Sequence, residues 1–82
     1  MAVRERILGI VSKHVKTPID KIADEAVLAN DLGVDSLTLF EIILDLEREF
    51  SCEIPEKDSE DIVSISSAVK YIENKIAQGT AK

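Results

Sequence analysis

Apolar residues recur at spacings of three and four in three stretches of the chain, the pattern of amphipathic helices. The first stretch begins with Val3, Ile7 and Ile10. Asp35 or Ser36 is placed to cap the second stretch, and Ser64 to cap the third. The pattern predicts three long helices, over residues 3–15, 36–50 and 65–77.

The segments between these helices predict little regular structure. Residues 17–34 are expected to form a long loop packed onto the core, and residues 57–62 a short helix. Residues 78–82 are expected to form a frayed tail. No segment alternates as a strand does. The sequence therefore predicts an all-α fold in a single domain over 1–82, an up-and-down bundle of three long helices plus one short helix.

The predicted second helix carries two separate apolar arcs. One arc has the width of a core-facing stripe and contains Leu39, Ile42, Ile43, Leu46 and Phe50. The other contains Leu37, Phe40 and Leu44, with Glu41, Asp45 and Glu47 around it. An apolar stripe rimmed by charge is typical of an interaction site, although the loop before Gly33 could instead cover it.

The charge of the chain is concentrated around this helix. The net charge of the 82 residues is −6, but residues 30–61 hold 11 of the 16 acids and two bases, a net of −9. The remaining 5 acids and 8 bases give +3. This field would repel nucleic acid and favours partners with basic docking surfaces. No apolar run reaches the length of a membrane span, so we expect a cytoplasmic protein.

The chain offers few groups for catalysis or metal binding. Cys52 is the only cysteine and is read as an ordinary loop thiol, and His14, the only histidine, is read as a surface residue. A serine hydrolase would need a histidine beside Ser36, but His14 belongs to another helix. We therefore expect neither a catalytic centre nor a metal site.

The residues around the start of the second helix form a recognisable motif. The run is Asp31-Leu32-Gly33-Val34-Asp35-Ser36-Leu37. With Glu41, Leu46-Glu47, Glu49-Phe50, Glu53-Ile54-Pro55 and Tyr71-Ile72 in the same order along the chain, it resembles the acyl carrier protein family. A lone Asp-Ser-Leu would mean little, but the collinear set is specific.

The resemblance implies a chemistry for Ser36. In this family the serine receives 4′-phosphopantetheine from coenzyme A through a separate phosphopantetheinyl transferase. The arm then carries acyl groups as thioesters to acyl-transfer and condensing enzymes, and the carrier itself catalyses nothing. The acidic segment and the second apolar arc predict a docking surface for these partners beside Ser36, made of Asp35, Leu37, Phe40, Glu41, Leu44, Asp45 and Glu47. An acyl pocket in the opened core is expected among Leu46, Ile54, Ile62, Ala68 and Ile72.

Three positions depart from the common fatty-acid carriers and leave the pathway open. Thr38 stands where those carriers usually have Asp, Phe40 is bulkier than the usual Val, and Arg48 interrupts the acidic run. The chain could serve fatty-acid synthesis or a specialised acyl or polyketide pathway, and it is expected to be a monomer. Two alternatives remain: a peptidyl or aryl carrier, and a helical adaptor that binds a partner helix without covalent modification.

Overall fold

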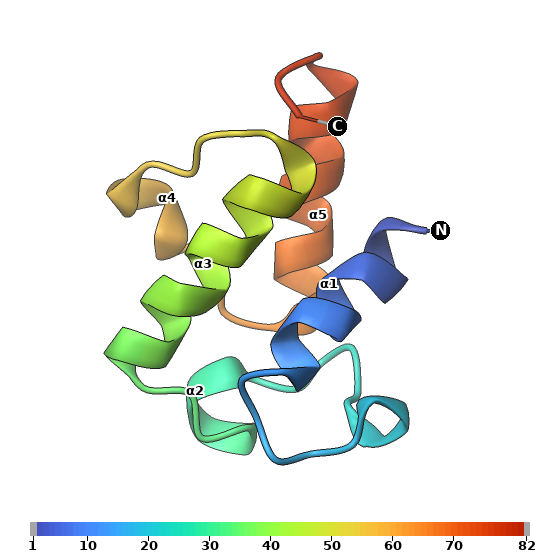
Figure 1. Cartoon of the computed structure of the whole chain (residues 1–82), viewed down its shortest axis with the longest axis vertical. Helices are drawn as coiled ribbons and strands as arrows, with labels where there is room; N and C mark the ends of the chain where they lie inside the picture. The colour runs from blue at the N-terminus through green and yellow to red at the C-terminus, as the bar shows by residue number, and fades with distance from the viewer. Residues whose placement is uncertain (1, 82) are drawn as a thin grey trace.

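The computed structural model describes residues 2–81 and contains three long helices that pack around one core. These are α1 (Val3–Ser12), α3 (Ser36–Phe50) and α5 (Ile65–Ala77). Helix α1 packs against both α3 and α5, and the long connection after α1 runs below the bundle to the start of α3 (Figure 1). No strand occurs between residues 2 and 81, so the predicted all-α class is confirmed.

Helices α3 and α5 have the predicted bounds because short-range signals fix their starts. The Asp35 carboxylate accepts the Thr38 N–H at 2.8 Å and caps α3. Ser64 and Ser67 form a reciprocal capping box at the start of α5. Of the two cap candidates for α3, the structure selects Asp35.

Helix α1 is shorter than predicted, since it ends at Ser12 instead of residue 15. The N–H groups of Lys13 and His14 bond three residues back, to Ile10 and Val11, which tightens and closes the last turn. His14 then leaves the helix and reaches across to α3. A tertiary contact therefore ends the helix before its apolar pattern does.

The predicted loop over residues 17–34 contains two short helical pieces, the 3-10 turn η1 (Ile19–Lys21) and α2 (Leu28–Asp31). Ile22 and Leu28 are buried and hold this segment on the core, as expected. Gly33 follows α2 with a φ of 68°, a value that glycine adopts without strain. This turn buries Val34 and delivers Asp35 to its capping position.

The short helix α4 spans Glu56–Ser59 instead of residues 57–62. Pro55 precedes it, and the chain leaves the helix through turns that place Ile62 in the core. Figure 1 shows α4 beside α3, on the side away from α1.

Residues 78–81 follow α5 as a turn, Met1 and Lys82 lie outside the described residues, and fraying of the tail stays a prediction. Gly79 adopts a φ of 76°, and the Thr80 N–H bonds back to the Lys75 carbonyl at 2.9 Å. This pattern is a Schellman motif, and it folds Ala81 against the protein. Ile76, near the end of α5, is 36% exposed.

Candidate functional site

Ser36 is the first residue of α3, and its side chain is exposed. Because Asp35 caps the helix, the Ser36 hydroxyl is not needed to accept a backbone N–H of the first turn. It forms no hydrogen bond within residues 2–81. The backbone N–H groups of Ser36 and Leu37 also lack acceptors among these residues, so they point to solvent at the positive end of the helix dipole.

The two apolar arcs of α3 separate as the sequence predicted. Ile42, Leu46 and Phe50 are fully buried, Ile43 is nearly so, and Leu39 packs partly against the core. Leu37, Phe40 and Leu44 remain 68%, 57% and 38% exposed. The alternative in which the preceding loop covers this second arc is therefore wrong. We call these three exposed side chains the apolar arc.

A groove of about 520 Å³ runs between α3 and α4, and Ser36 is part of its lining. Most of its surface is apolar, and two acids and a second serine complete it. The lining residues are Ser36, Leu39, Phe40, Ile43, Leu44, Glu47, Ile54, Glu56 and Ser59. Two members of the apolar arc, Phe40 and Leu44, thus face both solvent and this α3–α4 groove.

The five residues expected to form an acyl pocket are all buried. Leu46, Ile54, Ile62, Ala68 and Ile72 belong to the single core cluster. Only Ile54 also lines the α3–α4 groove. In the structure as it stands, the open space beside Ser36 is the groove, and the expected pocket is filled by its own side chains.

The acids assigned to docking differ in the hydrogen bonds and ion pairs that they form within the molecule. Glu41 is exposed and forms no ion pair within residues 2–81. Asp45 Oδ2 lies 2.7 Å from His14 Nε2, and Asp45 Oδ1 lies 3.8 Å from Arg48. Glu47 Oε2 accepts the Ile54 N–H at 2.7 Å. Among these three acids, only the Glu41 side chain has neither a hydrogen bond nor an ion pair within residues 2–81.

Sequence reasoning missed the His14 contact because 31 residues separate the ring from Asp45. The hydrogen bond from His14 is the main reason that the pKa of Asp45 lies below its ordinary value. The pKa of Asp35 is lowered as well, chiefly by the backbone N–H of Thr38. Both carboxyl groups are thus stabilised in their charged form.

Other reactive side chains are placed for structural roles. Cys52 is half-buried, and burial raises the pKa of its thiol, which opposes thiolate chemistry. Burial and a 2.7 Å hydrogen bond to Asp58 raise the pKa of Tyr71. No group of three or more His, Cys, Asp or Glu side chains within residues 2–81 is arranged to hold a metal ion. In the same part of the chain, each helix is too short or too polar to cross a bilayer.

Comparison with known proteins agrees with this geometry. Residues 5–72 match the sequence profile of the PP-binding family, described as "Phosphopantetheine attachment site". The acyl carrier protein from Enterococcus faecalis, described for its high thermal stability, has a similar structure with a TM-score of 0.77. The two sequences are 34% identical over 90% of this chain and 98% of the other.

Both matches cover most of the molecule and agree with each other. The chain belongs to the acyl carrier protein family, and phosphopantetheine is the cofactor of its attachment domain.

Proposed function

We propose that this protein is an acyl carrier whose Ser36 Oγ is esterified with 4′-phosphopantetheine. On that arm it holds acyl intermediates as thioesters for fatty-acid synthesis or for a related specialised acyl or polyketide pathway. The observation that carries the proposal is the exposed Ser36 hydroxyl, which has no hydrogen bond within residues 2–81 and opens onto an apolar groove at a helix start.

The residues around Ser36 fit a phosphodiester and a flexible arm. The unpaired N–H groups of Ser36 and Leu37 favour negative charge at this helix end. The α3–α4 groove has the size of a small-ligand site, which is typically about 300–1,000 Å³. When bound, the cofactor supplies a terminal thiol that holds the acyl chain.

The groove walls can then shield the first part of the cargo from water. Leu39, Ile43 and Ile54 provide apolar surface close to Ser36. A longer chain would need the core side chains to separate, and Leu46, Ile62, Ala68 and Ile72 are the residues that we propose would make room. The core residues pack in one buried cluster, so these side chains would separate only if burying the acyl chain gained enough free energy.

The surface around Ser36 suits partner enzymes with basic docking surfaces. The apolar arc supplies contact area, and Asp35 and Glu41 supply exposed negative charge. Asp45 and Glu47 remain in the proposed docking set, but with part of their hydrogen-bonding capacity already used. We propose that the phosphopantetheinyl transferase and the acyl-transfer and condensing enzymes use this face in turn.

The carrier proposal includes no catalytic step by the protein itself. The Ser36 hydroxyl forms no hydrogen bond to a base within residues 2–81, and His14 is bonded to Asp45. In the transfer, Ser36 Oγ forms a bond to the phosphopantetheine phosphorus, the diphosphate bond of coenzyme A breaks, adenosine 3′,5′-bisphosphate leaves, and the hydroxyl proton passes to a base of the transferase. We further propose a monomeric, cytoplasmic protein whose residues 1–82 act as one domain.

Intact-mass measurement tests the proposal directly. After incubation with coenzyme A, magnesium and a phosphopantetheinyl transferase, the parent protein should gain the mass of one phosphopantetheine group, and Ser36→Ala should gain none. Ser59→Ala is a matched control, because Ser59 lines the same groove and should leave modification intact. Unmodified parent protein, or equal modification of Ser36→Ala, would overturn the assignment and favour the adaptor alternative.

A further inference from the structure

The carboxylate of Asp45 is satisfied within the molecule. His14 occupies one oxygen at 2.7 Å, and Arg48 approaches the other at 3.8 Å. The positive charge of Lys13 adds to these effects in holding the pKa of Asp45 down. An acid that the sequence places among the docking residues is therefore already in contact with neighbours from the end of α1 and from α3.

Two of those neighbours keep their own charge exposed. The Arg48 side chain is 80% exposed, and at 3.8 Å its contact with Asp45 is too long for a good hydrogen bond. Lys13 is exposed and forms no ion pair within residues 2–81. Both residues line a small pocket of about 210 Å³ that Ile10, Asp45 and Glu49 complete. We call Lys13 and Arg48 the cationic patch.

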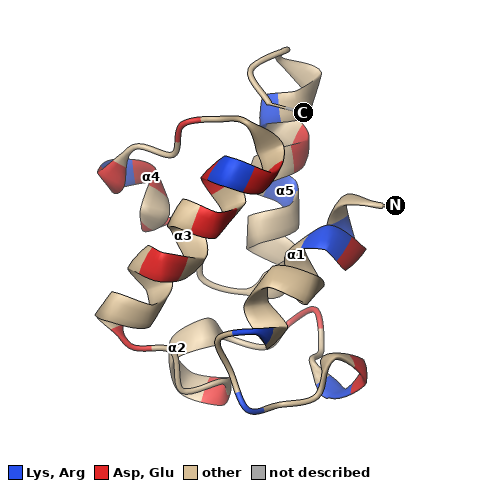
Figure 2. Ribbon diagram, viewed as in Figure 1, with Lys and Arg blue, Asp and Glu red and all other residues tan. Residues whose placement is uncertain are grey.

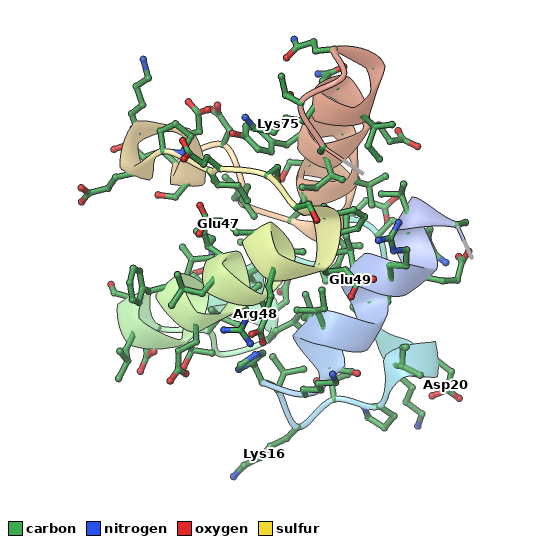
Figure 3. All side chains as sticks on the ribbon, turned by 45° about the horizontal axis from the view of Figure 1, so that its top comes forward. Lys16, Asp20, Glu47, Arg48, Glu49 and Lys75 are labelled. Carbon is green, nitrogen blue, oxygen red and sulfur yellow. The ribbon has the colours of Figure 1, made fainter. Side chains whose placement is uncertain are left out.

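The remaining acid of this pocket is also engaged. Glu49 Oε2 lies 2.8 Å from Arg6 Nε, and the Glu49 carbonyl accepts a second bond from Arg6 at 3.0 Å. Figure 3 shows Glu49 between α3 and α1, whereas Arg48 points toward the loop that follows α1. Both acids of this pocket therefore have partners within the molecule, whereas Lys13 and Arg48 keep their charge exposed.

The edge of α3 that faces α4 is acidic. Glu47 points from α3 toward α4, away from Arg48 (Figure 3). Figure 2 shows acidic residues along α3 and α4 and basic residues in the loop after α1. Glu56 adds a second acid to the α3–α4 groove. The face around the apolar arc is thus of mixed charge, with acids toward α4 and at Glu41 and with the cationic patch near the end of α1.

We propose that the cationic patch is a second contact site for the partner enzymes and binds an aspartate or glutamate carboxylate on their docking surface. This inference rests on the proposed function, because it concerns the enzymes that act at Ser36. A guanidinium matches the planar geometry of a carboxylate and can bind it through two parallel hydrogen bonds. A partner with basic residues alone would be repelled by Lys13 and Arg48, so the patch selects partners of mixed charge.

Association kinetics with a purified phosphopantetheinyl transferase test the patch. Arg48→Glu should slow association about tenfold at low salt, and less at high salt, because exposed charges mainly steer encounter. Lys13→Glu should act in the same direction. Lys70→Glu on α5 is the matched control: it makes the same change in net charge at an exposed lysine outside this pocket and should change the rate much less. Arg48→Lys, which keeps the charge, should retain most of the parent rate.

Two further measurements keep the result interpretable. Thermal unfolding of each variant checks that loss of the Asp45 contact has not unfolded the bundle, and Lys13→Glu tests the patch without removing an ion pair. One acid-to-lysine change on the transferase docking surface should restore association of Arg48→Glu. If Arg48→Glu and Lys13→Glu associate as fast as Lys70→Glu or faster, the patch is not a contact site.

The same samples separate this inference from the function on which it rests. Mass measurement reports whether Ser36 is modified, whatever the association rates are. If the parent protein is modified but its association does not depend on the charges of Lys13 and Arg48, only the cationic-patch proposal is overturned. If the parent protein is not modified but its association still depends on Arg48, the carrier function is overturned and the cationic-patch proposal is not.

Discussion

Glu47 is bonded to the chain after α3 through both its side chain and its backbone. Its Oε2 accepts the Ile54 N–H at 2.7 Å, and its carbonyl accepts the Cys52 N–H at 3.1 Å. Ser51, between α3 and these contacts, adopts the left-handed conformation with a φ of 50°. A residue that the sequence assigns to docking therefore also shapes the turn that leads to α4 and the wall of the α3–α4 groove.

We expect Glu47→Ala to destabilise the protein by about 1–2 kcal/mol, because the half-buried Ile54 N–H loses its acceptor. Glu47→Gln keeps an acceptor oxygen and should cost less. Urea unfolding and hydrogen exchange of the Ile54 amide measure the effect, with exposed Glu53→Ala as the control. Unchanged protection of that amide in Glu47→Ala would show that the hydrogen bond contributes nothing.

Ser36→Ala should change the free energy of unfolding by less than about 0.5 kcal/mol, as is usual for exposed positions without structural contacts. Asp35→Ala should destabilise α3 measurably, because the Thr38 N–H loses its cap. Thermal unfolding of the two variants side by side tests the assignment. A larger loss in Ser36→Ala than in Asp35→Ala would reverse the roles of the two residues.

Phe50→Ala should destabilise the protein by about 3–5 kcal/mol, because the ring is fully buried at the end of the core arc. Arg6 stacks on the ring with its guanidinium carbon 4.2 Å from the ring centroid, so this contact is lost as well. Calorimetry or urea unfolding measures the loss. A variant as stable as the parent would contradict the division of α3 into two arcs.

The stability of the protein should fall in acid partly through Asp45. His14 holds the folded-state pKa of Asp45 below its unfolded value of about 3.9, so its contribution is complete above that value and is lost as pH falls through the folded-state pKa. Asp45→Asn should flatten the decline in melting temperature below about pH 4. Exposed Asp20→Asn is the control, and equal slopes in Asp45→Asn and the parent would rule out this contribution.

Charge and apolar contact should affect partner binding differently. Glu41→Lys should slow association with the transferase at low salt and progressively less at high salt, because an exposed charge is screened over about 8 Å at physiological ionic strength. Phe40→Ala should raise the dissociation rate at every salt concentration. Ile19→Ala, an exposed apolar residue on η1, is the control for Phe40. Salt-independent association of Glu41→Lys would argue against steering by this acid.

The features that were predicted correctly have local signals in the sequence. The bounds of α3 and α5 follow from an apolar period that begins directly after a capping residue, Asp35 or Ser64. The exposed apolar arc follows from helical geometry alone, since Leu37 and Phe40 cannot share a face with Ile42.

The features that were missed depend on contacts between residues far apart in the sequence or on the backbone conformation at a helix end. Helix α1 ends early as His14 turns toward Asp45, 31 residues away. The helical pattern places Glu47 on the surface, but its carboxylate accepts a hydrogen bond from the backbone N–H of Ile54. The turn that closes α5 forms because Gly79 permits the bond from Thr80 to Lys75, which a composition-based reading of the tail does not consider.

Asp35 caps α3 and Ser36 offers the attachment oxygen, so the two roles fall on different residues. This division has a thermodynamic consequence. A substituent on Ser36 Oγ displaces no hydrogen bond within residues 2–81, so it leaves the Asp35 cap available to the first turn of α3. Attachment at this oxygen is therefore not linked to the folding equilibrium through the cap. The bare and the loaded protein therefore share the same Asp35 cap, and adding or removing the group requires no rearrangement of that hydrogen bond.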